Sequence, residues 1–198
     1  MPSLDAFDVT RRAREAYGPD GRLALPKQTG WPIFPFETDG LRMRAVEDPV
    51  LPEPPRNGED GPESCSTCTE RGGDGLVWSD ERWLVVMPAE PASLPGLTLH
   101  TRAHLDFSDL TDELGAELGV LMVRAQRALA SIEGVGRVHV YKWGDGGAHL
   151  HIFLVARPAG MIQLKGMYSS TWLFALPPLP TDNWQAMRDH VAASLGGP

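Results

Sequence analysis

The 198-residue chain has few cysteines, fewer basic than acidic side chains and no long apolar run. Its two cysteines, Cys65 and Cys68, are separated by two residues, which excludes a disulfide framework and favours a metal or redox role in a reducing compartment. No run of about eighteen apolar residues could span a membrane, and the polar N-terminus lacks the apolar segment of a secretory signal. We therefore expect a soluble, cytoplasmic protein with no membrane partner.

The excess of acidic side chains argues against a nucleic-acid partner. Lysine and arginine number 18 against 26 aspartate and glutamate residues, so the formal net charge is −8 at pH 7. Tight binding of a nucleic-acid polymer needs many basic side chains against the phosphates, and we expect no such partner. A small anionic ligand at one local site is compatible with this charge.

Length and hydrophobic content indicate the domain organisation. With 42% hydrophobic residues, a chain of this length can bury one core. Residues 1–60 are expected to form an N-terminal extension that drapes over the core and ends in an acidic linker rich in proline and glycine. One domain is then expected over residues 61–198.

Hydrophobic periodicity and turn residues predict the elements of this chain. Strands are expected over residues 76–78, 83–87, 97–100, 138–143 and 148–155. Helices are expected from Ser3 to Tyr17, from Thr111 to Gly134 and from Asp182 to Gly196. The first helix has a ragged apolar stripe, so we expect it to be peripheral. This order predicts an α+β fold with an antiparallel β-sheet, one long helix and a C-terminal helix.

Two histidines after a glycine turn carry the most informative chemical signal. His149 and His151 alternate with apolar residues. Side chains of a strand alternate between its faces, so the two imidazoles are predicted to share one face with Gly147 and Phe153. Adjacent imidazoles on a rigid strand can bind a metal or attack phosphorus. The alternative is a pair of partly buried histidines bonded to backbone carbonyls.

The cysteine pair indicates a metal site if two further ligands are found. A structural zinc site is tetrahedral, and two thiolates supply half of its ligands. His104, after the third predicted strand, and His149 are available to complete it. Two buried thiols beside a glycine-rich turn are one alternative. A thioredoxin-like dithiol is another, but no βαβ pattern follows the cysteines.

Several short motifs in a fixed order resemble the histidine triad (HIT) superfamily of nucleotide hydrolases and transferases. They are Cys65-x-x-Cys68, the strand pair through Trp78 and Trp83, Leu94-Pro95-Gly96, Arg102-Ala-His104, the helix start at Ser108, and the glycine turn before His149-Leu-His151. The superfamily pattern is His-x-His-x-His, and Phe153 stands at its third position in this chain.

The resemblance implies a structural zinc ion, a nucleophile and a homodimer. In bacterial zinc-containing members, the metal ligands fall on Cys65, Cys68, His104 and His149 of this chain. The nucleophile falls on His151. In an alternative register, Gly147, His149 and His151 occupy the three positions, and His149 is then the nucleophile.

The residues near His151 are the candidate substrate-binding groups. Gly146 and Gly147 let backbone N–H groups approach phosphate oxygens without a Cβ in the way. Lys142 and Arg157 are the nearest basic side chains, and the alternative for each is a solvated surface position. A neutral imidazole attacks phosphorus when one ring nitrogen keeps its proton in a hydrogen bond and the other faces the substrate.

The resulting hypothesis is a nucleotide hydrolase or nucleotidyl transferase. Attack of His151 on the α-phosphate of a dinucleoside polyphosphate or nucleoside phosphoramidate would form a nucleotidyl-histidine intermediate. Phe153 cannot donate a hydrogen bond to phosphate. The loss of one such donor lowers the rate about a hundredfold relative to a complete triad. A second hypothesis is therefore a zinc-stabilised nucleotide-binding or sensing module without turnover. A third, a hydrolase whose zinc activates water, needs an open coordination position that four protein ligands do not leave.

Overall fold

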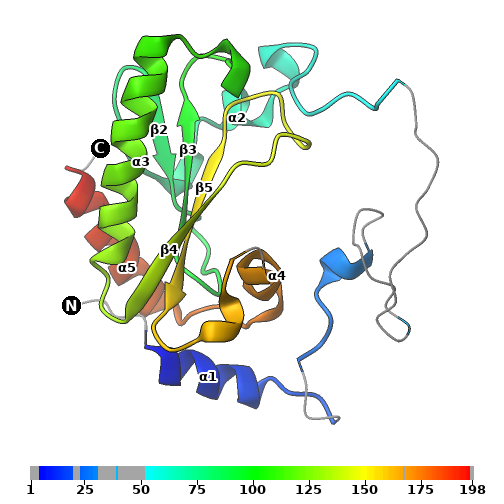
Figure 1. Ribbon diagram of the computed structural model, residues 1–198, viewed down its shortest axis with the longest axis vertical. Helices are drawn as coiled ribbons and strands as arrows, with labels where there is room; N and C mark the ends of the chain where they lie inside the picture. The colour runs from blue at the N-terminus through cyan, green and yellow to red at the C-terminus, as the bar shows by residue number, and fades with distance from the viewer. Residues whose placement is uncertain (1–4, 20–22, 31–38, 40–51, 167, 197–198) are drawn as a thin grey trace.

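The computed structural model describes residues 5–19, 23–30, 39, 52–166 and 168–196. Within these ranges the chain forms a five-stranded antiparallel sheet in the order β1-β2-β3-β5-β4 (Figure 1). The strands are β1 (Leu76–Ser79), β2 (Trp83–Val86), β3 (Gly96–Thr101), β4 (Val135–Tyr141) and β5 (Ile152–Pro158). The helices are α1 (Ala6–Glu15), α2 (Ser66–Glu70), α3 (Asp112–Ala130), α4 (Tyr168–Ala175) and α5 (Thr181–Leu195). Short 3-10 turns lie at Lys27–Gly30, Pro62–Ser64, Gly73–Gly75, Phe107–Asp109 and Ile162–Leu164.

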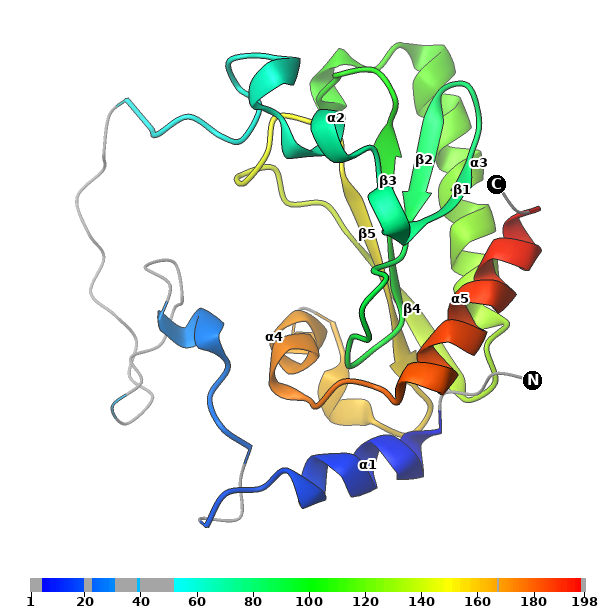
Figure 2. The ribbon, with the colours of Figure 1, turned by 180° about the vertical axis from the view of Figure 1, so that it is seen from behind.

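The two longest helices cover one face of the sheet. Figures 1 and 2 show α3 and α5 on this face and α4 on the other. Alternate residues of β3 are buried, as expected for a sheet packed on one side. Leu99 and Leu154 of the central strands are fully buried with Leu129 of α3 and Met187 of α5. The α+β fold with an antiparallel sheet is thus confirmed.

The long helix and the C-terminal helix lie where their apolar stripes predict. The Thr111 hydroxyl caps α3 by accepting a hydrogen bond from the Leu114 N–H at 3.2 Å. Gly196 ends α5 in the left-handed conformation, with φ of 99°, that favours glycine. Arg124 of α3 donates to the carbonyl of Leu195 at 2.8 Å and joins the two helices. No helix in the described ranges is both long enough and apolar enough to cross a membrane.

The N-terminal helix is more closely packed than expected. Val9 and Ala13 of α1 are buried in the core, with exposed fractions of 2% and 7%. Arg12 donates hydrogen bonds to the carbonyls of Pro177 and Pro178. The helix lies at the edge of the molecule (Figure 1), and two small apolar side chains one helical turn apart are enough to pack it against the core. The predicted cap, Ser3, lies outside the described residues.

The hairpin around the histidine pair differs from the prediction. β4 and β5 pair from Val135↔Pro158 to Tyr141↔Phe153. β4 therefore ends two residues earlier, and β5 begins four residues later, than the predicted strands on either side of the turn. Residues 142–151 form an irregular loop, because their backbone N–H groups donate hydrogen bonds to residues outside the hairpin. The Ala148 N–H donates to the Asn57 carbonyl at 2.9 Å, and the Leu150 N–H donates to the Leu105 carbonyl at 2.7 Å. His149 and His151 therefore lie just before β5 rather than on a strand.

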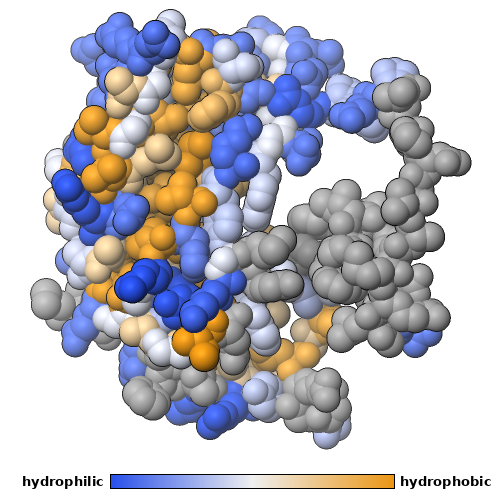
Figure 3. Space-filling model, in the orientation of Figure 1, coloured by the Kyte–Doolittle hydropathy of each residue, from blue (hydrophilic) through white to orange (hydrophobic). Residues whose placement is uncertain are grey.

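Apolar side chains are also exposed over α3 and β4, as Figure 3 shows. Val120 and Val123 of α3 and Val140 of β4 are exposed. Val120 and Leu129 thus offer a matched pair within one helix, one exposed and one buried.

Truncation of Leu129 to alanine is expected to destabilise the protein by about 2–5 kcal/mol, because it removes a fully buried side chain and leaves a cavity. Val120→Ala, at a position 62% exposed, should change the free energy of unfolding by less than about 0.5 kcal/mol. Urea unfolding followed by circular dichroism measures both. Equal midpoints for the two variants would contradict the packing of α3 described above.

Candidate metal centre and histidine site

Four side chains predicted as metal ligands converge at one end of the sheet. They are Cys65, Cys68, His104 and His149, and their ligand atoms all lie within 4.8 Å of one another. The thiols come from the start of α2, His104 from the segment after β3, and His149 from the loop before β5. Segments far apart in the sequence thus supply two sulfur and two nitrogen donors to a single cluster.

The spacing of the cluster fits zinc. Nδ1 of His149 lies 3.4 Å from Sγ of Cys65 and 3.3 Å from Sγ of Cys68, and Nδ1 of His104 lies 3.3 Å from Sγ of Cys68. In a tetrahedral zinc site, bonds of about 2.3 Å to sulfur and about 2.0 Å to nitrogen separate S and N by about 3.5 Å. Two thiolates and two imidazoles form the closed four-ligand set of a structural zinc site.

The outer ring nitrogens of both histidines are held by backbone carbonyls. Nε2 of His149 lies 2.8 Å from the carbonyl of Thr101, and Nε2 of His104 lies 3.1 Å from the carbonyl of Gly58. A carbonyl only accepts, so each Nε2 carries the proton and each Nδ1 turns its lone pair toward the thiols. This is the arrangement that orients imidazole ligands around a metal.

Burial shifts the protonation of the cluster. Burial, followed by the neighbouring Cys65 thiol, raises the pKa of Cys68 to about 11. Burial also lowers the pKa of His149, so its imidazole is neutral and free to act as a ligand. Without a cation the Cys68 thiol keeps its proton at neutral pH. A divalent cation would displace this proton and compensate the charge of the thiolate.

Residues 56–58 form a strap that ties the cluster to the glycine loop, residues 144–147. The Asn57 N–H donates to the Gly146 carbonyl at 3.2 Å, and the Asn57 side chain bonds both the Ser64 carbonyl and the Ser66 N–H beside the cysteines. Gly58 has φ of 81°, and a Cβ there would lie 2.9 Å from Cβ of Cys65. Only glycine fits so close to the ligands.

Arg56 holds the other side of the glycine loop. Its Nη1 donates to Asp106 at 2.7 Å and to the carbonyls of Gly144 and Gly147 at 3.0 and 3.5 Å. Burial would raise the pKa of Asp106, but hydrogen bonds from the Phe107 N–H and from Arg56 lower it below its ordinary value. Asp106 is therefore an ionised anchor for Arg56. The strap was missed in the sequence, where only the turn dipeptide Asn57-Gly58 marks it.

His151 lies beside the cluster, and both of its ring nitrogens face backbone carbonyls. Its Nδ1 donates to the carbonyl of His149 at 2.7 Å, and its Nε2 lies 2.5 Å from the carbonyl of Trp143. His149 is 3% exposed with its Nδ1 against the thiols, whereas His151 is only partly buried. This difference in exposure favours the register in which His151, not His149, is open to a ligand.

The candidate substrate-binding residues are only partly brought together. Gly147 lies against His151, since a Cβ at this glycine would be 3.8 Å from Cε1 of the imidazole. Gly146 is the next residue of the loop, and Lys142 reaches its base, with Nζ 3.9 Å from Asp106. Arg157 is elsewhere: it is buried and donates to the carbonyls of Pro158 and Met161.

Arg157 is far from His151 because of the length of the strand that separates them. Arg157 is six residues beyond His151, and a strand advances about 3.3 Å per residue, so the two side chains lie about 20 Å apart along β5. The expectation that Arg157 binds the substrate at His151 is therefore wrong.

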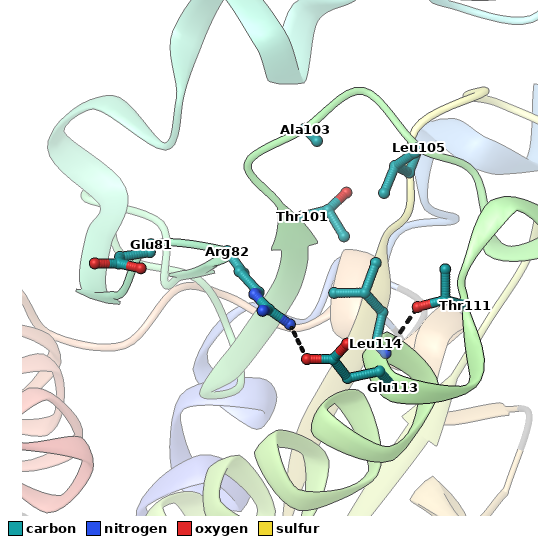
Figure 4. Close-up of a pocket in the computed structure, with 8 residues that line it drawn as sticks. All are labelled: Glu81, Arg82, Thr101, Ala103, Leu105, Thr111, Glu113 and Leu114. Atoms are coloured by element: carbon teal, nitrogen blue, oxygen red, sulfur yellow. Dashed lines mark hydrogen bonds and ion pairs between the residues drawn. The ribbon is translucent and has the colours of Figure 1, made fainter.

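A cavity of about 310 Å³ lies between the start of β2, the end of β3 and the start of α3 (Figure 4). It is lined by Glu81, Arg82, Thr101, Ala103, Leu105, Thr111, Glu113 and Leu114. Arg82 is paired with Glu113 and Glu117, both at 2.8 Å, so its charge is already balanced. The cavity contains none of the predicted site residues and offers no unpaired cation to an anionic ligand.

Comparison with known proteins supports the fold. No protein-family model and no curated protein matches the chain. Among solved structures, a histidine triad protein from Bradyrhizobium japonicum aligns with a TM-score of 0.51 at 18% identity, over 61% of this chain and 89% of that chain. A hypothetical histidine triad nucleotide-binding protein from Sulfolobus tokodaii aligns with a TM-score of 0.50 at 14% identity, over 67% and 92%. The chain therefore has the fold of histidine triad proteins.

Gly58→Ala is expected to weaken zinc binding about 10- to 100-fold, because the new Cβ crowds Cys65 and His104 and moves a carbonyl that orients a ligand. Competition with a chromogenic chelator measures the affinity. Gly73→Ala is the matched control, since Gly73 also has a positive φ, 47°, but nothing lies within 4 Å of its Cβ position. Equal zinc affinity in both variants would show that the strap does not support the ligands.

Proposed function

We propose that the protein is a nucleotide hydrolase or nucleotidyl transferase that acts through His151. Its substrate class is a nucleotide with a second group on the α-phosphate, as in a dinucleoside polyphosphate or a nucleoside phosphoramidate. The observation that carries the proposal is the hydrogen bond from Nδ1 of His151 to the His149 carbonyl, 2.7 Å long. This bond holds the proton on Nδ1, so that Nε2 becomes the attacking atom once the Trp143 carbonyl beside it is displaced.

The reaction proceeds in two displacements at phosphorus. The Nε2 lone pair of His151 forms a bond to the α-phosphorus, the bond from phosphorus to the second group breaks, and that group leaves with its electron pair and takes a proton from solvent. Water then attacks the α-phosphorus of the nucleotidyl-histidine and loses its proton. The bond from phosphorus to Nε2 breaks, its electron pair returns to His151, and the nucleotide is released. An alcohol or phosphate in place of water would make the same step a transfer.

The glycine loop must make room for the substrate. The Trp143 carbonyl lies 2.5 Å from Nε2 of His151 and occupies the direction of attack. A phosphate bound there displaces this carbonyl and faces the N–H groups of Gly146 and Gly147. These glycines have no Cβ to obstruct a phosphate oxygen. Lys142, at the base of the loop, supplies the nearest positive charge.

The metal centre has a positioning role in this proposal. Zinc bound by four side chains supplies fold stability and no open coordination position. His149 connects the two centres, because its ring faces the cysteines while its carbonyl accepts from His151. A hydrolase in which the metal activates water is not favoured by this ligand set.

A second candidate function is nucleotide binding without turnover. Phe153, in the position of the third triad histidine, is the observation that favours it, because phenylalanine cannot donate a hydrogen bond to the phosphate. The structural neighbour from Sulfolobus tokodaii is described only as a nucleotide-binding protein. The cytoplasmic location expected from the composition and the homodimer implied by the resemblance stay predictions.

His151→Ala is expected to reduce the release of AMP from diadenosine tetraphosphate and from adenosine phosphoramidate by about 1,000-fold or more, because it removes the nucleophile. His190→Ala, on α5 with its ring on Ser131, should retain the wild-type rate. Chromatographic quantification of AMP gives both rates, and zinc content and circular dichroism verify the fold. Turnover that survives His151→Ala would refute the proposal, whereas an inactive wild type that binds AMP would establish the second candidate.

Replacement of Phe153 by histidine restores a donor at the third triad position. We expect the rate of AMP release to rise about a hundredfold, the contribution of one group that stabilises the developing charge. Phe153→Leu is the control, because it changes the side chain without adding a donor. Steady-state kinetics on adenosine phosphoramidate distinguish them, and equal rates for the two variants would exclude a missing donor as the limit on turnover.

A further inference from the structure

Three aromatic side chains form a continuous row beside His151. The rings of Tyr141 and Trp143 have centroids 5.2 Å apart at an interplanar angle of 33°, and those of Trp143 and Phe153 are 6.3 Å apart at 40°. Tyr141 and Phe153 are direct partners across β4 and β5, so the sheet fixes their spacing. The row lies on the face of the sheet that α3 does not cover, since the neighbouring residues Ile152 and Leu154 face the core.

The row is rigid at its base and exposed at its end. The Tyr141 hydroxyl is hydrogen bonded to the Gly166 carbonyl at 2.7 Å and to the hydroxyl of Ser169. Phe153 is held on both sides, by Thr98 of β3 and by Tyr141 of β4. Trp143, at the end of the row, is 49% exposed. The exposed Trp143 ring packs against these two held rings, so it presents stacking surface to a ligand with little loss of side-chain freedom.

The row reaches the reacting atom. The ring centroids of Phe153 and His151 are 5.4 Å apart in an edge-on arrangement, and the Trp143 carbonyl touches Nε2 of His151. A ligand that takes the place of this carbonyl at Nε2 is therefore adjacent to Trp143. The row itself has no formal charge, whereas Lys142 lies next to Trp143 in the chain. A phosphate at His151 and a flat apolar group on the row would both meet matching surroundings.

We propose that Trp143 and Phe153 form a stacking subsite for a planar aromatic ring of the ligand that reacts at His151. This inference rests on the function proposed above and specifies its substrate class. The ring belongs either to the nucleobase or to an aromatic leaving group, which share the same stacking chemistry. In this reading Phe153 determines specificity: the chain exchanges a phosphate donor at the third triad position for an aromatic surface.

The first arm of the test measures binding without turnover. Isothermal titration calorimetry compares AMP with ribose 5-phosphate, which keeps the sugar and phosphate and lacks the base. Trp143→Leu and Phe153→Leu remove stacking surface, Trp143→Phe retains it, and Tyr17→Leu alters an exposed aromatic residue outside the row. If the nucleobase stacks on the row, the two leucine variants lose about 5- to 150-fold in affinity for AMP and none for ribose 5-phosphate.

The second arm tests the leaving group. The values of kcat/KM are compared for adenosine phosphoramidates of 2-phenylethylamine and 2-cyclohexylethylamine, amines that differ in the aromatic face and little in basicity. If the leaving group stacks on the row, wild type prefers the phenyl substrate, and Trp143→Leu and Phe153→Leu remove that preference. Trp143→Phe should restore most of the lost preference or affinity in whichever arm responds, and Tyr17→Leu should match wild type in both.

The outcomes separate this inference from the proposed function. If wild type turns over both substrates and neither leucine variant changes binding or preference, the stacking subsite is overturned and the function stands. AMP binding that depends on Trp143 in a protein without turnover overturns the hydrolase and supports the subsite. If wild type binds neither AMP nor ribose 5-phosphate and has no turnover, both are overturned.

Discussion

A single residue, His149, connects the two centres of this protein, and the arrangement of both depends on how it is held. The hydrogen bond from its Nε2 to the Thr101 carbonyl turns its Nδ1 toward the cysteines. The backbone carbonyl of the same residue accepts a hydrogen bond from Nδ1 of His151. The side chain thus serves the metal centre and the backbone serves the reactive imidazole. A change in the position of this residue would affect the metal geometry and the protonation of His151 together.

The sheet and the loops have different roles in forming the site. The central strands, buried under α3 and α5, supply fixed end points from which His104 and His149 extend. The irregular segments bring the site residues together, because the backbone groups of one loop form hydrogen bonds with another loop instead of with a strand. The Asn57 bonds to the glycine loop and to the cysteine turn are the clearest case. Order in the site therefore comes from hydrogen bonds between loops as much as from the regular elements.

Sequence patterns predict the parts of this structure that local physics controls. α3 and α5 could be predicted because their apolar stripes repeat with the helical period. The four metal ligands could be predicted because the cysteine spacing indicates a zinc site and the resemblance to histidine triad proteins implies the two histidines. The hairpin could not be bounded, since the partners of Ala148 and Leu150 are Asn57 and Leu105, remote in the chain. Arg157 was misplaced for a different reason: it is near His151 in the sequence, but six extended residues place it about 20 Å away. The strap at 56–58 carries almost no periodic signal at all.

The strap also changes where the functional unit begins. The sequence places the expected domain boundary at residue 61, yet Gly58 supplies a carbonyl to His104, and Arg56 and Asn57 bracket the glycine loop. A polypeptide cut just before Cys65 would retain every ligand, the candidate nucleophile and the whole sheet. It would still lack one wall of its own site, and the loop beside His151 would lose the contacts that give it a shape.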